Sequence, residues 1–106
     1  MTAAALIQSL PQRMKAGAGQ GIDLLYHFKI SGEHGGDFTV KVKDGICTVE
    51  NGLSGDPKCE IEAKDTVYED VEMGRTNAQM AVLFGKLKVS NIPSLLKFVE
   101  MFERAV

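Results

Sequence analysis

Alternation of apolar and polar side chains over residues 23–50 constrains the fold more than any other feature of the sequence. Every second residue is apolar from Leu24 to Ile30 and again from Phe38 to Val42. A period of two is typical of strands that bury one face. Asp44-Gly45 follows the second run, and this dipeptide favours a two-residue type I′ turn because both central positions need positive φ. The sequence therefore predicts a meander of three strands that ends near Glu50.

Helices and two further strands are predicted around this meander. Good helix formers fill residues 3–10, and Pro11 suits the first turn of a short second helix. The remaining predicted elements are a fourth strand over residues 58–64, helices between Asp65 and Gly74 and between Thr76 and Gly85, a fifth strand over residues 86–89, and a final helix opened by Asn91 and Pro93. Asp65, Thr76 and Asn91 are the predicted N-caps. This order indicates one α+β domain over residues 1–106.

Two of the predicted helices are unusually apolar. Residues 78–84 are apolar except for Gln79, which predicts a helix buried on nearly all sides. At about 100° per residue, apolar side chains cover more than half of the final helix, namely Ile92, Leu95, Leu96, Phe98, Val99, Met101, Phe102, Ala105 and Val106. One sheet cannot cover so wide an arc. Either other helices cover the remainder, or part of the arc lines a cavity for an apolar ligand.

The charge balance and the length limit the classes of function. The 106 residues carry a formal net charge of -2, which argues against a nucleic-acid partner because phosphate binding depends on an excess of Lys and Arg. No apolar run approaches the ~20 residues of a membrane span, and the first residues do not resemble a secretory leader. We therefore expect a cytoplasmic protein whose Cys47 and Cys59 stay reduced.

Residues able to carry chemistry are present but scattered. Cys47, Cys59, His27 and His34 are suitable zinc ligands, but no two of them have the close spacing that presents paired ligands to one ion. No set of acid, base and nucleophile converges either. The sequence thus predicts no metal, no cofactor and no catalytic residues, and an enzyme ranks third among the candidate functions.

Four stretches, in this order and spacing, resemble the sterol carrier protein family, specifically its sterol-binding domain of the non-specific lipid-transfer type. They are Phe38–Gly45, Pro57–Asp65, Gly74 with Asn77–Ala81, and Phe84–Val89. The last is the most specific, because in that family a glycine ends a short helix and a Lys-Leu-Lys edge strand leads into the final helix. Two features depart from the family pattern. Ser90-Asn91 stands where Gly-Asp is common, and the peroxisomal signal of animal members is missing, so the chain is most similar to stand-alone prokaryotic members.

The resemblance implies a fold and a function. It implies a five-stranded, largely antiparallel sheet with helices on one face and an apolar tunnel between sheet and helices. It also implies non-enzymatic binding and carrying of a lipid, such as a fatty acid, a fatty acyl-CoA, a sterol-like lipid or an isoprenoid. From strand alternation and helix faces we predict that the tunnel is lined by Phe38, Val40, Ile61, Met73, Met80, Phe84, Leu87, Phe98, Met101 and Phe102.

The alternative function is an accessory or scaffold domain. In that interpretation the excess apolar arc of the final helix holds a protein partner or a second copy of the chain. Beside the lipid, two partners stay open at this point, namely a membrane surface contacted transiently and a homodimer.

Overall fold

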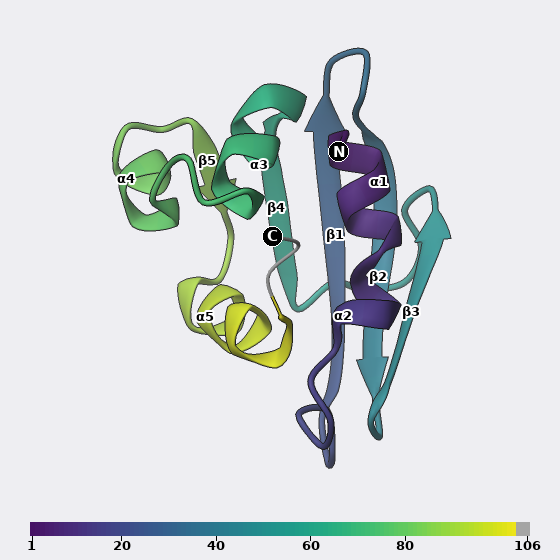
Figure 1. Cartoon of the computed structure of the whole chain (residues 1–106). Helices are drawn as coiled ribbons and strands as arrows, with labels where there is room; N and C mark the ends of the chain where they lie inside the picture. The colour runs from purple at the N-terminus through teal and green to yellow at the C-terminus, as the bar shows by residue number, and fades with distance from the viewer. Residues whose placement is uncertain (104–106) are drawn as a thin grey trace.

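The computed structural model describes residues 1–103 and contains one five-stranded sheet with helices packed against it (Figure 1). The strands lie in the order β3-β2-β1-β4-β5. The elements are α1 Ala3–Gln8, α2 Leu10–Arg13, β1 Asp23–Ser31, β2 Gly36–Lys43, β3 Ile46–Asn51, β4 Cys59–Lys64, α3 Asp65–Glu72, α4 Ala78–Leu83, β5 Leu87–Val89 and α5 Ile92–Met101. Ala105 and Val106, which were counted in the apolar arc of the final helix, lie outside the described residues.

The predicted meander is confirmed in the first three strands. β1 pairs antiparallel with β2, with Tyr26 opposite Val40, and β2 pairs antiparallel with β3. The turn between β2 and β3 has positive φ at both predicted positions, 50° at Asp44 and 83° at Gly45. The Asp-Gly signal therefore fixed this register locally.

The fourth strand joins the sheet in the opposite sense. β4 runs parallel to β1, with Phe28 opposite Ile61, and the three-residue β5 pairs antiparallel with β4 at the sheet edge. The sheet is thus largely antiparallel with one parallel pair, as the family resemblance implies.

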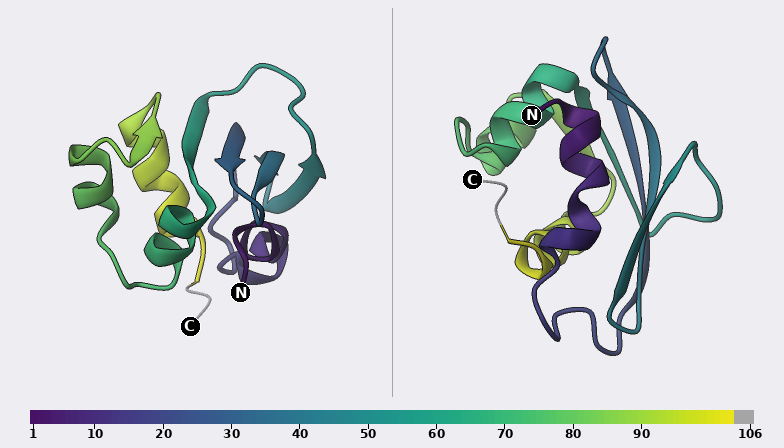
Figure 2. Two further views of the ribbon diagram at one scale, coloured as in Figure 1. Left: turned by 90° about the horizontal axis from the view of Figure 1, so that it is seen from above. Right: turned by 45° about the vertical axis from the view of Figure 1, so that its right-hand side comes forward.

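Helices α1 to α5 lie on one side of the sheet, as the right-hand view of Figure 2 shows. The face beneath them is built from every second strand residue, including Tyr26, Phe28, Val40 and Ile61, which are buried. The apolar face of α1 adds Leu6 and other buried side chains to this core. The core therefore lies between the sheet and the helical layer, which is where the resemblance implies the lipid site.

The outer face of the sheet is partly covered by the loop between β3 and β4. The Nε2 atom of His27 lies 2.8 Å from the carbonyl oxygen of Ser54, and the hydroxyl of Thr39 donates to the carbonyl oxygen of Gly52 over 2.8 Å. His27 and Thr39 are buried on this face. These bonds give His27 a structural role in holding the loop.

Two predicted N-caps are wrong by one residue. Asn77, not Thr76, caps α4, and its Oδ1 accepts bonds from the amides of Gln79 and Met80. The N-cap position of α3 is Lys64, and Asp65 is the first residue of the helix. Asn91 caps α5 as predicted, since its Oδ1 accepts from the Ser94 amide over 3.1 Å.

The predicted burial of α4 is also wrong. Ala81 is the buried residue of this helix, whereas Met80, Leu83 and the following Phe84 are exposed. The physical reason is the small size of its support, because α4 packs on the edge strand β5, which has only three residues. One short strand covers one face of a helix and leaves the opposite face open. The apolar arc of α5 is likewise only partly covered, since Phe98 and Met101 are buried while Leu96 and Val99 are exposed.

None of the helices within residues 1–103 has the length and apolar character needed to cross a membrane.

Candidate functional site

A cleft of about 410 Å³ opens between the helices on the β5 side of the molecule. Its wall comes from α2, from the end of α3 and the connection to α4, and from the second half of α5. The lining residues are Leu10, Arg13, Val71, Glu72, Gly74, Arg75, Thr76, Asn77, Ala78, Phe98, Val99, Phe102 and Glu103. The volume falls within the range of about 300–1,000 Å³ that is typical of ligand pockets.

A smaller apolar space of about 60 Å³ adjoins this cleft on the side of the sheet. It is lined by Phe28, Ile61, Tyr68, Val71, Glu72, Ala78, Leu87, Leu95, Phe98 and Val99. The two spaces share five lining residues, which shows that they adjoin: Val71, Glu72, Ala78, Phe98 and Val99. We call them together the α3–α5 cleft, with a wide outer part and a narrow inner part.

A polar triad stands in the wall of this cleft. The Oε2 atom of Glu72 accepts a hydrogen bond from the Tyr68 hydroxyl over 2.8 Å and one from Nη2 of Arg13 over 3.0 Å. Burial, together with the neighbouring Glu72 carboxylate, raises the pKa of Tyr68 well above its usual value. The guanidinium of Arg13 also donates to the carbonyl oxygens of Leu6 and Glu103. The triad therefore ties α2, α3 and the end of α5 around the cleft.

Two backbone hydrogen bonds lie beside the wide part of the cleft, where Arg13 and Glu103 line its wall. The amide of Lys15 donates to the carbonyl of Met101 over 2.8 Å, and the amide of Glu103 donates to the carbonyl of Arg13 over 2.7 Å. The segments after α2 and after α5 thus lie side by side, and they join the ends of the two helices that flank the wide part.

The structure brings four of the ten predicted lining residues together at the cleft, namely Ile61, Leu87, Phe98 and Phe102. Phe38, Val40 and Met101 are buried in the hydrophobic core but do not line the described cleft, and Met73 is half-buried against that core. Met80 and Phe84 lie exposed on and after α4. Their role as ligand contacts stays a prediction.

Residues of the cleft that the sequence analysis missed include the triad Arg13, Tyr68 and Glu72. Tyr68 and Glu72 are four residues apart on α3, a spacing that places them on one helix face and that a reading of the sequence could have used. Arg13 gave no such signal, since it reaches Glu72 from 59 residues away in the chain.

The two cysteines lie apart in the sheet. Cys47 is on β3 and Cys59 on β4, with β2 and β1 between them, so they are separated by about 14 Å at ~4.8 Å per strand step. A disulfide needs Cα atoms within about 7 Å. Burial raises the pKa of Cys47 to about 11 and also raises that of Cys59, so both thiols stay protonated and weakly nucleophilic at neutral pH.

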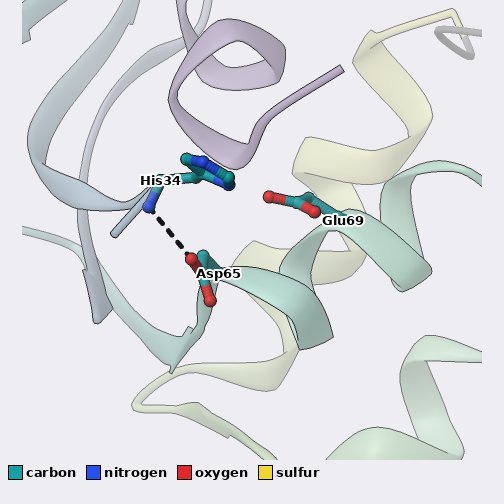
Figure 3. A group of neighbouring side chains, drawn as sticks. All are labelled: His34, Asp65 and Glu69. Carbon is teal, nitrogen blue, oxygen red and sulfur yellow. Dashed lines mark hydrogen bonds between the residues drawn. The ribbon is translucent and has the colours of Figure 1, made fainter. Parts of the chain in front are cut away.

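A second polar cluster lies at the other end of α3 (Figure 3). The ligand-type atoms of His34, Asp65 and Glu69 lie within 4.8 Å of one another. The carboxylates, however, accept backbone hydrogen bonds: Asp65 accepts from the amides of His34 at 3.0 Å and Thr66 at 2.8 Å, and Glu69 from the amide of Ala3 at 2.9 Å. This polar clasp holds the β1–β2 turn, the start of α1 and the start of α3 together.

The clasp predicts a specific response to acid. Hydrogen bonds from the His34 and Thr66 amides lower the pKa of Asp65 below its usual value. A lowered folded-state pKa stabilises the fold above the unfolded-state pKa of about 3.9, and this contribution is lost as the pH falls through the folded-state pKa. Asp65→Asn is therefore expected to lower the melting temperature at pH 7 and to flatten its dependence on pH below 4. Thermal melts followed by circular dichroism at several pH values measure both effects.

Asp56→Asn serves as the control for this prediction, since Asp56 is exposed in the loop between β3 and β4. It should leave the melting curves unchanged. If Asp65→Asn and the unmodified protein lose stability in parallel below pH 4, the clasp does not depend on the ionised Asp65.

Several solved structures have the same fold. The sterol carrier protein domain 2 of Helicoverpa armigera is 21% identical, with a TM-score of 0.73 over 92% of this chain and 80% of that one. Palmitated sterol carrier protein 2-like 2 of Aedes aegypti is 14% identical, with a TM-score of 0.72 and full coverage of both chains. A stereoselective inverting sec-alkylsulfatase from Pseudomonas sp. matches all of this chain at 13% identity and a TM-score of 0.84, but the match spans only 17% of the sulfatase.

Sequence comparison gives the family directly. No curated protein sequence matches the chain. The sequence model of the SCP-2 sterol transfer family, in contrast, matches residues 4–103, which contain every helix and strand described above. Because that match spans nearly the whole chain and agrees with the fold of the sterol carrier structures, the protein belongs to the SCP-2 sterol transfer family.

Proposed function

We propose that the protein binds an apolar lipid in the α3–α5 cleft and carries it without chemical change. The observation that carries this proposal is the polarity gradient of the cleft. Its narrow part ends on Phe28, Ile61 and Leu87, whereas its wide part opens beside Arg75 and Asn77. The candidate ligands are a fatty acid, a fatty acyl-CoA, a sterol-like lipid or an isoprenoid, and a solved relative is described as palmitated.

The gradient favours one orientation of the ligand. Burial of an apolar chain against the sheet contributes a favourable free energy of roughly 25 cal/mol per Å² of buried surface. A polar end group would then lie at the mouth, where Arg75, Thr76 and Asn77 line the wall. The binding of an amphiphile thus needs no strong polar contact inside the protein.

The narrow part must widen to take a long chain. Its volume of about 60 Å³ equals that of about two water molecules in the liquid. Leu95 and Val99 form part of its wall and are not fully buried, so they are the side chains with room to move. We propose that the ligand opens this inner space into the tunnel that the family resemblance implies.

The polar triad supports a carrier rather than an enzyme. Glu72 accepts bonds from both Tyr68 and Arg13, which leaves it a poor general base, and the raised pKa of Tyr68 keeps its hydroxyl protonated. Cys47 and Cys59 are buried thiols with raised pKa values. These unpaired cysteines suit a reducing compartment, so we place the activity in the cytoplasm.

Blocking the cleft is expected to weaken lipid binding. Ala78 lines both parts of the cleft, so a tryptophan there would occupy space that the ligand needs. Excluding only ~60 Å² of apolar ligand surface weakens binding about tenfold. Ala78→Trp should therefore weaken the binding of a fluorescent fatty acid at least tenfold, measured by titration of the purified protein.

Gln79→Trp is the matched control, because Gln79 is the next residue of α4, is exposed and does not line the cleft. It should bind like the unmodified protein. Native mass spectrometry of the protein as purified should also reveal bound lipid. A lipid-free protein that binds no fluorescent fatty acid would refute the proposed function.

A further inference from the structure

Three side chains of the types that bind transition metals meet at the start of α3. They are His34, Asp65 and Glu69, the residues of the polar clasp, and none of them lines the α3–α5 cleft. Asp65 and Glu69 are four residues apart on α3, which places them on one face of the helix. His34 comes from the turn between β1 and β2. The cluster is therefore separate from the proposed lipid site.

The spacing of the ligand atoms fits a single metal ion. One ring nitrogen of His34 and one oxygen of each carboxylate all lie within 4.8 Å of one another. Zinc binds nitrogen and oxygen at about 2.0–2.2 Å, so two ligand atoms of one ion lie at most about 4.4 Å apart. Small side-chain rotations would bring the three atoms to one ion. Figure 3 shows the imidazole of His34 and the carboxylate of Glu69 pointing toward each other beside Asp65.

Backbone hydrogen bonds hold the two carboxylates and still leave coordinating atoms available. Oδ1 of Asp65 accepts from the Thr66 amide and Oδ2 from the His34 amide, so each oxygen keeps a second lone pair. Oε2 of Glu69 accepts from the Ala3 amide, a bond that does not use Oε1. Carboxylates that bind metals are commonly oriented by such additional hydrogen bonds.

The main chain of His34 is held from two sides. Its amide donates to Asp65 over 3.0 Å, and its carbonyl oxygen accepts from the Ala4 amide over 3.0 Å. Gly32 allows the turn to approach α3 this closely, because a Cβ atom there would lie 2.5 Å from Cγ of Asp65. The imidazole makes no hydrogen bond with Asp65 or Glu69 (Figure 3). The ring is thus placed in advance, and a preorganised ligand loses little conformational freedom on binding.

The cluster carries negative charge that no ion pair within residues 1–103 neutralises. Neither Asp65 nor Glu69 is paired there with a lysine or an arginine. Asp65 has only 8% of its surface exposed, and Glu69 is half-buried. Two carboxylates this close repel each other, and burial leaves less water to screen them. A cation between them would remove this repulsion.

We propose that His34, Asp65 and Glu69 bind one divalent transition-metal ion of the zinc type, which joins the β1–β2 turn to α3. An imidazole together with carboxylates suits such an ion, whereas Mg²⁺ and Ca²⁺ prefer oxygen ligands throughout. The spacing of Cys and His in the sequence predicts no metal, but that pattern does not count carboxylates brought in by the fold. Three protein ligands leave a coordination position for water.

Calorimetric titration with zinc chloride tests the proposal on tag-free protein that has been treated with a chelator. We expect one zinc ion to bind per chain and an excess of Mg²⁺ or Ca²⁺ not to compete. His34→Ala should weaken zinc binding at least about tenfold, because even the loss of an outer-shell partner costs that much. His34 is exposed, so this variant should fold like the unmodified protein. Equal zinc affinity in the two proteins would overturn the proposal.

Two substitutions of glutamate separate coordination from charge. Glu69→Gln removes the ligand but keeps a side-chain oxygen for the Ala3 amide, and it should weaken zinc binding by a similar factor. Glu33→Gln is the matched control, because Glu33 is exposed in the same turn as His34 and is not part of the cluster. It should bind zinc like the unmodified protein. An equal loss in both variants would overturn the proposal, since the attraction would then be a general effect of charge.

Cobalt(II) in place of zinc reports the identity of the ligands. The absorption spectrum should lack the charge-transfer band of a cobalt–thiolate bond, because Cys47 and Cys59 lie on β3 and β4 and not in the cluster. A thiolate band would overturn the assignment.

Melting curves give a second measure of the same site. Zinc should raise the melting temperature of the unmodified protein and of the Glu33 variant but not that of the His34 variant, since an ion that binds the folded state stabilises it. Absence of any shift in the unmodified protein would overturn the proposal. Titration with fluorescent fatty acid without zinc should give the same affinity for the His34 variant as for the unmodified protein, so the lipid cleft is judged separately.

Discussion

Phe98→Ala is expected to lower the free energy of unfolding by about 3–5 kcal/mol, which is a large part of the stability of a small domain. Phe98 is buried on α5, and its ring centroid lies 4.9 Å from that of Tyr26, 5.5 Å from that of Phe28 and 4.6 Å from that of Phe102. Truncation therefore removes three aromatic contacts and leaves a cavity between the sheet and α5.

Urea denaturation followed by circular dichroism measures this loss. Leu96→Ala is the control on the same helix, because Leu96 is about half exposed and should cost less than about 1 kcal/mol. Equal costs for the two substitutions would contradict the assignment of Phe98 to the core. Since Phe98 also lines both parts of the cleft, the variant should accept bulkier lipids than the unmodified protein.

Arg13→Ala is expected to cost about 2–3 kcal/mol of unfolding free energy. Besides its bonds to Glu72, the guanidinium donates to the carbonyl of Leu6 at 2.8 Å, to that of Glu103 at 3.0 Å and to the hydroxyl of Ser9 at 2.9 Å. The pair with Glu72 is largely buried, with 12% and 18% of the two side chains exposed. The loss of unfolding free energy stays below that for a fully buried ion pair, because the Tyr68 hydroxyl still donates a hydrogen bond to the Glu72 carboxylate.

Arg75→Ala provides a direct comparison for Arg13→Ala. The Arg75–Asp70 pair has a similar geometry, at 2.8 Å, but 57% and 47% of its side chains are exposed. An exposed pair contributes about 0–1 kcal/mol, so the Arg75 variant should unfold almost like the unmodified protein. A double-mutant cycle of Arg13→Ala with Glu72→Gln should give a coupling energy above about 1 kcal/mol. Independent effects of these two substitutions would show that Arg13 acts through its backbone contacts alone.

Strands and their register were predictable because local chemistry specifies them. The alternation from Leu24 to Ile30 and the turn at Asp44-Gly45 each depend on neighbouring residues only, and both are confirmed. The N-cap of α5 at Asn91 is also specified by neighbouring residues, and it is confirmed as well. The parallel pairing of β4 with β1 was not predicted from periodicity, since period two does not encode the direction of a partner strand.

The burial of α4 could not be predicted from composition. Residues 78–84 contain almost only apolar side chains, and a pattern without a polar face gives no information on which side is covered. The extent of cover depends on β5, whose three residues support one face of the helix. The exposure of Leu83 and Phe84, which the sequence did not predict, therefore depends on the tertiary contacts of α4.

The cleft was predictable only in its apolar part. Ile61, Leu87 and Phe98 follow from strand alternation and helix faces, because lining residues and core residues share one sequence pattern. For the same reason the pattern also selected Phe38 and Val40, which lie in the core away from the cleft. Arg13 carries no periodic signal, because it reaches Glu72 from a helix that lies 59 residues away in the chain.

The single parallel strand pair has a consequence for the order in which the molecule folds. β1, β2 and β3 are joined by short connections, so their contacts close small loops, whereas β4 must return to β1 across the whole meander. Contacts between residues far apart in sequence form late, because chain entropy must be lost before they are made. The meander is thus the early, durable unit, and β4 with the helices after it is the unit expected to open by partial unfolding. The cleft lies mainly in this second unit. We therefore expect the amide protons of α4 to exchange faster than those of β2. Such local opening would let a lipid enter the cleft without global unfolding of the protein.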